Sequence, residues 1–228
     1  MLTRTSADNP VGILVVAKAP VPGQVKTRLG ATIGAQASAA VAAAAVLDTL
    51  DTVAAAPVAA RVLALSGDLD AAVCGDEIRC RAADFTVIGQ RGVGLAERLA
   101  NAHADAATAL PGLAFLQIGM DTPQITADLI ADCARRLCRH DALIGPARDG
   151  GWWLLGLTDP RLAGCLRTVP MSQPDTGSCT LSALQKLGIR VGIAPELDDV
   201  DTAADVIAVR GECAPDSRFV EATRGIGD

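Results

Sequence analysis

Residues 12–30 read GILVVAKAPVPGQVKTRLG, an apolar run followed by a loop rich in proline, glycine and cations. The uninterrupted apolar run from Gly12 to Ala17 predicts a strand that is buried on both faces, as the strands of parallel sheets are. Two prolines and a glycine then stiffen the loop and disfavour helix. This first unit indicates an α/β sheet with a functional loop at the end of a strand.

The rest of the chain repeats the alternation of strand and helix. Further β-type runs span Arg61–Leu65, Phe85–Ile88, Leu113–Ile118, Ala142–Gly145, Trp152–Leu157 and Arg190–Ile193, and helical stretches span Ala35–Ala56, Leu95–Leu110, Thr126–Cys138 and Cys179–Leu187. Alternation of this kind predicts a single-domain α/β protein with a mostly parallel, Rossmann-like sheet flanked by helices. We expect the domain at residues 11–213, with an N-terminal tail at 1–10 and a C-terminal tail at 214–228.

Composition excludes several classes of protein. A net charge of -6 over 228 residues argues against a nucleic-acid binder, which needs a basic surface. The seven cysteines include no C-x-x-C pair, which favours reduced thiols in a cytoplasmic protein. The N-terminus has no apolar signal region, and the alanine-rich stretch 35–56, which contains Asp48 and Asp51, is interpreted as a packed helix rather than a membrane span. The sequence leaves the oligomeric state open.

The loop after the first strand carries three cations. Lys18, Lys26 and Arg28 lie around its prolines and its glycine. Cations and free backbone amides in a stiff loop suit a diphosphate or a triphosphate, although the loop is not a Walker A motif. The alternative is a rigid surface turn with solvated charges.

A carboxylate follows the strand at 113–118. Asp121 stands in the sequence GMDTP, residues 119–123, just beyond the strand end. A carboxylate in this place suits Mg²⁺ or Mn²⁺ bridging phosphate groups. Helix capping is the alternative role of Asp121, and Thr122 or Thr126 could serve it as well.

Residues 145–153 read GPARDGGWW and form the third unusual loop. Gly150 and Gly151 would let the backbone approach a ligand, and Trp152 and Trp153 could wall a sugar or acceptor pocket. The alternative is a plain turn between two strands, with the tryptophans alternating between core and surface. For Asp149 we favour a functional role.

Two further segments follow strand ends. Residues 197–205 bring three acids within four positions, so Asp199 and Asp201 are candidate metal ligands, while Asp201 alternatively caps the helix that begins near Ala203. Residues 89–94 contain three glycines before a helix and could admit a base, ribose or phosphate. A flexible connection is the equally simple alternative for the glycine loop.

A few features are set aside. His103 and His140 have no partner nearby in the sequence and are interpreted as surface or helix residues. Ser66 and Ser172 lack the G-x-S-x-G context of a serine hydrolase. No G-x-G-x-x-G follows the first strand, which disfavours a nicotinamide dehydrogenase.

Several of these loops together resemble one family. AKAPVPGQVKTRL, residues 17–29, is similar to the opening motif of a bacterial glycosyltransferase A-like family, formerly domain of unknown function 2064. That family lies in the nucleotide-diphospho-sugar transferase superfamily, which also contains molybdenum-cofactor and phospholactate guanylyltransferases. GMDTP resembles its G-x-D-x-P element with Met120 at a position that is often small. GPARDGGWWLLG resembles G-P-A-x-D-G-G-Y-Y-L-x-G with tryptophan at both tyrosine positions, and DVDTA resembles D-I-D-T-P with Ala203 replacing proline.

The resemblance extends over Gly12–Val209 and implies roles for particular residues. It implies nucleotide and phosphate contacts at Ala17, Lys18, Lys26, Arg28, Gln90 and Gly94, a divalent Mg²⁺ or Mn²⁺ at Asp121, Asp199 and Asp201, and an acceptor pocket at Gly150, Gly151 and Trp153. Asp149 would orient the acceptor or act as a base.

Three functions remain open at this point. The first is metal-dependent glycosyl transfer from a nucleotide-diphosphate sugar to a small-molecule acceptor. The second is nucleotidyl transfer, in which a phosphorylated acceptor attacks a nucleoside triphosphate and pyrophosphate leaves. The third is a nucleotide-binding module without turnover. The fold by itself does not choose among them.

Overall fold

The computed structural model describes residues 10–227, and the expected N-terminal tail lies almost wholly outside them. Seven strands form one sheet: β1 (Val11–Lys18), β2 (Ala60–Ser66), β3 (Thr86–Gly89), β4 (Ala114–Ile118), β5 (Ala142–Pro146), β6 (Trp152–Leu157) and β7 (Val191–Ile193). The helices are α1 (Thr27–Ile33), α2 (Ala35–Ala55), α3 (Gly75–Arg81), α4 (Gly94–Ala109), α5 (Ala127–Leu137), α6 (Thr176–Gln185), α7 (Ala203–Arg210) and α8 (Arg218–Ala222), with 3-10 segments η1 (Ala82–Asp84) and η2 (Pro160–Thr168). The predicted α/β class is confirmed.

The strand order is β3-β2-β1-β4-β6-β5-β7, and the pairings are parallel except at β6. Strand β6 runs antiparallel to both β4 and β5. Its first residue, Trp152, therefore lies at the same edge of the sheet as the carboxyl ends of β1 and β4. This reversal brings the GPARDGGWW loop to the edge where ligands bind in parallel sheets.

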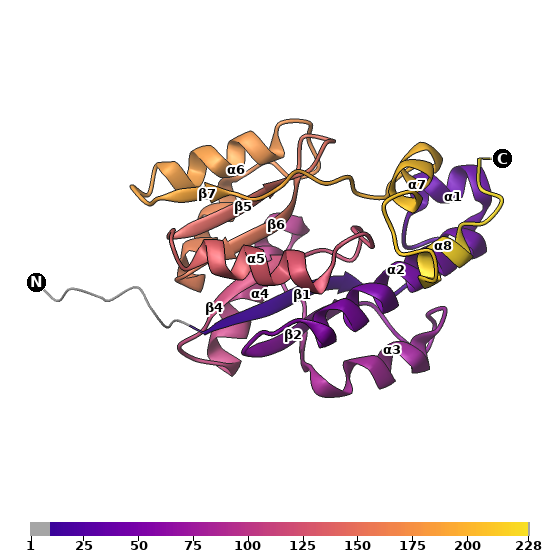
Figure 1. Cartoon of the computed structure of the whole chain (residues 1–228), viewed down its shortest axis with the longest axis horizontal. Helices are drawn as coiled ribbons and strands as arrows, with labels where there is room; N and C mark the ends of the chain where they lie inside the picture. The colour runs from indigo at the N-terminus through magenta and orange to yellow at the C-terminus, as the bar shows by residue number, and fades with distance from the viewer. Residues whose placement is uncertain (1–9, 228) are drawn as a thin grey trace, which may run out of the picture.

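Helices cover both faces of the sheet (Figure 1). Alternate residues of β1 and β4 belong to two separate cores: Ile13 and Leu116 pack with α2 and α5, whereas Leu14 and Phe115 pack against α4. This two-sided burial explains why the strands read as continuous apolar runs. Helix α2 is the one described helix long and apolar enough to cross a membrane, and 67% of its apolar window is buried inside the fold.

The C-terminal segment corrects one expectation. Residues 214–227 do not form a tail, because α8 packs onto α2 beside α1 and α7, at one end of the molecule (Figure 1). Phe219 is fully buried there, and Asp48 of α2 accepts the Phe219 backbone N–H at 2.8 Å. Gly225 and Gly227 favour fraying of the chain end, but the burial of Phe219 outweighs that tendency.

Candidate functional site

A cavity of about 590 Å³ opens at the carboxyl ends of β1 and β4 and at the start of β6. Most of the site residues expected from the sequence line it: Ala17, Lys18, Arg28, Gln90, Asp121, Asp149, Gly151, Trp153, Asp199 and Asp201. Lys26, Gly94 and Gly150 do not line it. The strand-end rule therefore brings segments as far apart as residues 17 and 201 to one site.

Asp121 follows β4 and faces the cavity. Helix α5 is capped by Thr126, whose side chain accepts the Leu129 N–H at 3.1 Å, so Asp121 is not needed as a cap. The Asp121 Oδ1 atom lies 2.9 Å from Lys26 Nζ. That contact has the distance of an ion pair without the angles of a hydrogen bond, and Oδ1 is a buried oxygen with no hydrogen-bond partner.

Lys26 contacts the carboxylates of Asp121 and Asp201 from the protein interior and does not line the cavity. It adopts a left-handed conformation with φ 47° at the start of α1, and its side chain is 5% exposed. Its Nζ contacts Asp121 and Asp201, at 2.9 and 3.2 Å, and donates to the Val200 carbonyl. Burial opposes the charged ammonium, but the two carboxylates outweigh it, and the pKa of Lys26 is raised.

This geometry corrects the expected role of Lys26. An ammonium has three N–H donors. In Lys26 two of them bond to the Asp201 carboxylate and the Val200 carbonyl, and the Asp121 carboxylate lies at ion-pair distance. Lys26 therefore serves as an internal counter-ion that holds Asp121 and Asp201 together, and it is not a phosphate ligand in this arrangement.

Asp201 joins residues 197–205 to the loop after β1. Its Oδ2 lies 3.1 Å from Arg28 Nη1, while its Oδ1 contacts Lys26. The alternative role as a helix cap falls to Thr202, which forms a capping box with Asp205 at the start of α7. Arg28 is 71% exposed and lines the cavity, so its guanidinium can also contact a ligand.

Asp199 is the carboxylate with the most perturbed chemistry. Burial and then repulsion from Asp149 and Asp201 raise the pKa of Asp199 to about 6. Its neighbour Asp198 faces another way, because Arg148 Nη1 donates to it at 2.6 Å. Of the three acids at positions 198, 199 and 201, Asp199 and Asp201 line the cavity and Asp198 does not.

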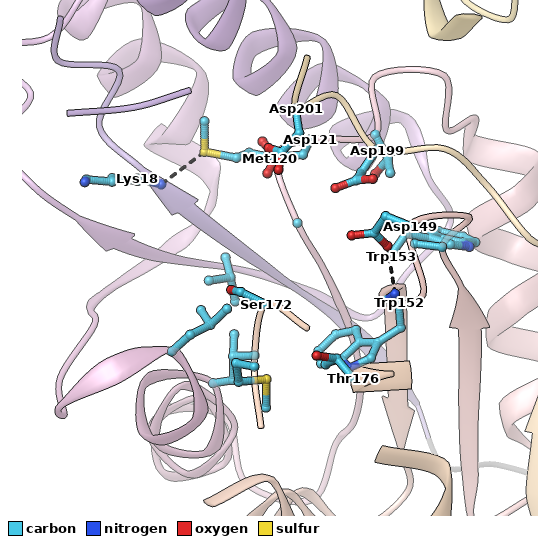
Figure 2. Close-up of a pocket in the computed structure, with 18 of the residues that line it drawn as sticks. Lys18, Met120, Asp121, Asp149, Trp152, Trp153, Ser172, Thr176, Asp199 and Asp201 are labelled. Atoms are coloured by element: carbon cyan, nitrogen blue, oxygen red, sulfur yellow. Dashed lines mark hydrogen bonds between the residues drawn. The ribbon is translucent and has the colours of Figure 1, made fainter. Parts of the chain in front are cut away.

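Asp149 approaches the cavity opposite Asp199 (Figure 2). Its Oδ1 accepts the Gly151 backbone N–H at 2.7 Å, which fixes the carboxylate at the start of β6. The other oxygen is left for a ligand or for a proton. The four acids Asp121, Asp149, Asp199 and Asp201, termed the acid cluster below, thus come from three loops.

Gly150 has a structural reason to be glycine. Its φ is 91°, and a Cβ there would lie 1.8 Å from the Pro174 carbonyl oxygen. The expected close approach of backbone to ligand is therefore wrong for Gly150, which instead contacts the segment before α6. Gly151 lines the cavity.

The two tryptophans divide between core and cavity. Trp153 is 3% exposed and donates from Nε1 to the Pro195 carbonyl at 2.9 Å, so only an edge of it reaches the cavity. Trp152 is half-buried, also lines the cavity, and donates from Nε1 to Thr180 Oγ1 at 3.2 Å. Both tryptophans therefore contribute to the cavity wall.

The first loop presents two exposed cations, Lys18 and Arg28. Lys18 Nζ donates to the Gln24 carbonyl at 2.5 Å, and the Lys18 backbone N–H donates to Met120 Sδ at 3.1 Å (Figure 2). Gln90 Nε2 donates to the carbonyls of Ala17 and Ala64, at 2.8 and 2.9 Å. Gln90 thus ties the end of β3 to β1 and β2, and Gly94 begins α4 outside the lining.

Sequence reasoning missed several lining residues. Ser66 is the last residue of β2, so the strand-end rule could have found it. Arg98, Leu99 and Gln117 lie within elements, where no motif marked them. The segment 171–176 follows a 3-10 helix instead of a strand, and it reaches the cavity through its packing on Gly150.

The donor chemistry of the acid cluster suits a hard divalent cation. Carboxylate oxygens are the ligands that Mg²⁺ and Mn²⁺ prefer, and Asp121 Oδ1 has no hydrogen-bond partner. Across residues 10–227, no three His, Cys, Asp or Glu side chains are already arranged around one ion. Such a site fits a cation bound by one or two carboxylates that completes its shell with phosphate oxygens and water.

A family model described as an uncharacterized protein conserved in bacteria (DUF2064) matches residues 49–173. The chain belongs to this family. None of the curated proteins matches it. The resemblance inferred from the loop motifs is thereby confirmed for DUF2064.

Solved structures add fold and superfamily. A protein from Desulfovibrio desulfuricans G20, assigned as a candidate nucleotide-diphospho-sugar transferase, is 27% identical, with 94% of each chain covered and a TM-score of 0.80. CMP:2-keto-3-deoxy-manno-octonic acid synthetase complexed with CTP is 12% identical, covering 89% of this chain and 97% of that one at a TM-score of 0.54. Rv0371C from Mycobacterium tuberculosis H37Rv, in complex with manganese, is 16% identical, covering 88% and 97% at 0.52. DUF2064 therefore shares its fold with both transferases of sugars and transferases of nucleotides.

Proposed function

We propose that this DUF2064 protein is a metal-dependent glycosyltransferase that uses a nucleotide-diphosphate sugar as donor. One observation carries the proposal: the acid cluster and the cations Lys18 and Arg28 face one cavity at the carboxyl edge of the sheet. A bound diphosphate needs positive charge, and four carboxylates need a cation, so a metal–diphosphate complex satisfies both.

The roles follow from the contacts. Lys18 and Arg28 would bind phosphate oxygens, and Asp121 with Asp199 would hold Mg²⁺ or Mn²⁺. When bound, the cation would neutralise the charge that develops on the leaving diphosphate. Lys26 keeps Asp121 and Asp201 in place from below. Asp149, fixed by the Gly151 N–H, would orient the acceptor hydroxyl or accept its proton.

The relatives support this assignment by analogy. The 27% identical protein carries the name of a nucleotide-diphospho-sugar transferase, and a neighbour of the same fold binds manganese.

Nucleotidyl transfer is the second candidate. A neighbour with the same fold was solved with CTP, and another is a nucleotidyl transferase from Methanothermobacter. The basic first loop could hold a triphosphate equally well. The two reactions differ in the leaving group, which is a nucleoside diphosphate in the first and pyrophosphate in the second.

A thermal-shift screen tests the metal–nucleotide site. Nucleoside di- and triphosphates and nucleotide sugars would be added with and without Mg²⁺ or Mn²⁺, to the wild type and to Asp121→Ala. Ligand at about a hundredfold excess over Kd adds about 2.7 kcal/mol of stability. We expect metal-dependent stabilisation of the wild type that Asp121→Ala removes. Asp128→Ala, an exposed acid on α5 outside the cavity, is the matched control.

The outcome separates the candidates. Release of a nucleoside diphosphate from the preferred ligand supports glycosyl transfer, and release of pyrophosphate supports nucleotidyl transfer. Nucleotide binding that persists unchanged in Asp121→Ala, with no product, would favour the non-catalytic module. No shift with any nucleotide would refute the site.

A further inference from the structure

The cavity has two chemically different flanks along the strand order. Ser66, which ends β2, and Gln90, which follows β3, line one flank, and the acid cluster lies toward β4 and β6. Lys18 lies between them, at the end of β1. If the proposed glycosyl transfer holds, the bond that breaks must lie beside the acids. The base then occupies the β2–β3 flank and the sugar the β4–β6 flank.

Gln117 is an unexplained polar residue on the sugar flank. It is the penultimate residue of β4, pairs with Leu155 of β6, is 2% exposed, and still lines the cavity. Its Oε1 atom is buried, and no donor, the neighbouring His103 ring included, meets hydrogen-bond geometry with it. A buried amide oxygen of this kind costs about 1–3 kcal/mol unless a ligand satisfies it.

A neutral histidine stands behind Gln117. His103 of α4 is fully buried, and neither ring nitrogen has a partner that meets hydrogen-bond geometry. Burial lowers the pKa of His103 to about 4, which a neighbouring interaction with Gln117 only partly opposes. His103 is therefore uncharged at neutral pH, and this part of the cavity wall provides hydrogen-bonding groups without charge.

The surroundings of Gln117 are apolar or neutral. Val16 and Leu99 line this part of the cavity, as do the half-buried Trp152 and the hydroxyl-bearing Thr176. Arg98 is the one cation on the α4 wall, and its described polar contact is to the Gly92 carbonyl at 3.5 Å. Apolar surface combined with an acceptor oxygen suits a ring that has C–H faces and hydroxyl edges.

We propose that Gln117 determines specificity by accepting a hydrogen bond from a hydroxyl of the donor's uncharged sugar ring. The inference rests on the proposed function for the donor and goes beyond it in naming the contact. A pocket whose buried acceptor takes a hydrogen bond from a ligand hydroxyl discriminates against ligands without that hydroxyl, because the acceptor is then left unpaired.

Binding measurements with matched ligands test the contact. Dissociation constants of UDP, UDP-glucose, GDP and GDP-mannose would be measured by calorimetry with Mn²⁺ for the wild type, Gln117→Leu and Thr49→Val. Thr49 is the matched control, because its Oγ1 is equally buried and unpartnered but lies on α2 outside the cavity. In parallel, the Gln117 side-chain amide would be followed by NMR, with Gln117→Leu assigning its signal.

We expect one nucleotide sugar to bind more tightly than its own diphosphate. Gln117→Leu should reduce that gain about tenfold and leave diphosphate binding unchanged. Thr49→Val should change neither. The Gln117 amide signal should move with the nucleotide sugar and stay still with the diphosphate alone.

Other outcomes overturn the inference in distinguishable ways. A sugar gain that survives in Gln117→Leu, or no sugar gain at all, refutes the contact while the nucleotide site stands. An amide signal that moves with the diphosphate alone assigns Gln117 to base or phosphate. If no nucleotide binds, the proposed function fails. The sugar contact is then tested by titration with free glucose and mannose, and a Gln117 amide signal that does not shift refutes that contact as well.

Discussion

Asp48 and the acid cluster differ in how completely the fold pairs their carboxylate oxygens. Asp48, at the junction of α2 and α8, accepts the backbone N–H groups of Arg218 and Phe219, at 3.2 and 2.8 Å, and pairs with the Arg218 guanidinium at 3.3 Å. The acid cluster instead leaves Asp121 Oδ1 without a hydrogen bond and raises the pKa of Asp199 to about 6.

The contrast separates structural from functional charge. A carboxylate whose oxygens are all paired contributes to folding and has little capacity left for a ligand. Carboxylates that lie near one another with oxygens lacking hydrogen bonds reduce the stability of the fold. Folded proteins keep such arrangements mainly at sites that bind ligands or react. Three variants test this comparison.

The largest effect on stability is expected at Lys26. Lys26→Met removes the counter-ion shared by Asp121 and Asp201 and should lower the free energy of unfolding by about 3 kcal/mol. This figure is at the low end for a broken buried pair, because the carboxylates are 38% and 40% exposed. Urea denaturation in EDTA would measure it.

The stability of Lys26→Met should also be rescued by a divalent cation. Mg²⁺ should restore more stability to Lys26→Met than to the wild type, since a cation can replace the lost ammonium charge. Lys18→Met, which removes an exposed cation of the same loop, is the control and should change stability little. Equal effects of Mg²⁺ on both variants would show that the acid cluster does not attract a divalent cation.

Asp48 should show the opposite pattern. Asp48→Ala leaves the buried Phe219 N–H without an acceptor and should lower the free energy of unfolding by about 2 kcal/mol. The loss should be the same with and without metal or nucleotide. Asp51→Ala is its control, because that half-exposed acid pairs with the same Arg218 and should cost about 0–1 kcal/mol. A metal-dependent stability of Asp48→Ala unlike that of the wild type would undo the proposed division.

The smallest effect concerns pH. Because the folded pKa of Asp199 is raised from 3.8 to about 6, the folded state retains the Asp199 proton more tightly than the unfolded state. Its contribution to stability is therefore largest below about pH 4 and falls as the pH rises to about 6. The difference in free energy of unfolding between wild type and Asp199→Asn, measured in EDTA, should fall across that window. A difference that rises, or stays flat, would contradict the raised pKa.

Much of the site could be predicted because its residues follow strands. Asp121 lies in the short loop that follows β4, and Lys18 ends β1, so the strand pattern alone brings them to one edge. Lys26 could not be assigned in this way. Its loop motif indicates an anion-binding cation, but its left-handed backbone turns the side chain beneath the acids, and a sequence does not show that turn.

Gln117 and Gly150 were hidden for related reasons. Gln117 occupies an apolar strand, where periodicity gives no hint that one face opens into a cavity. The backbone of Gly150 adopts a positive φ against Pro174, a residue that follows a 3-10 helix and carries no motif. Both depend on contacts between segments that are distant in the chain.

The sequence by itself determined the α/β class, the approximate position of its strands and most of the charged residues that line the cavity, because strand periodicity and strand-end position are local properties. The tertiary structure decided which charge neutralises which. It placed Lys26 between Asp121 and Asp201, satisfied Asp48 with α8, and left Asp121 Oδ1 and Gln117 Oε1 without a hydrogen bond. Electrostatic and hydrogen-bond energies depend on distances of a few ångströms between remote residues, and only the folded chain sets those distances.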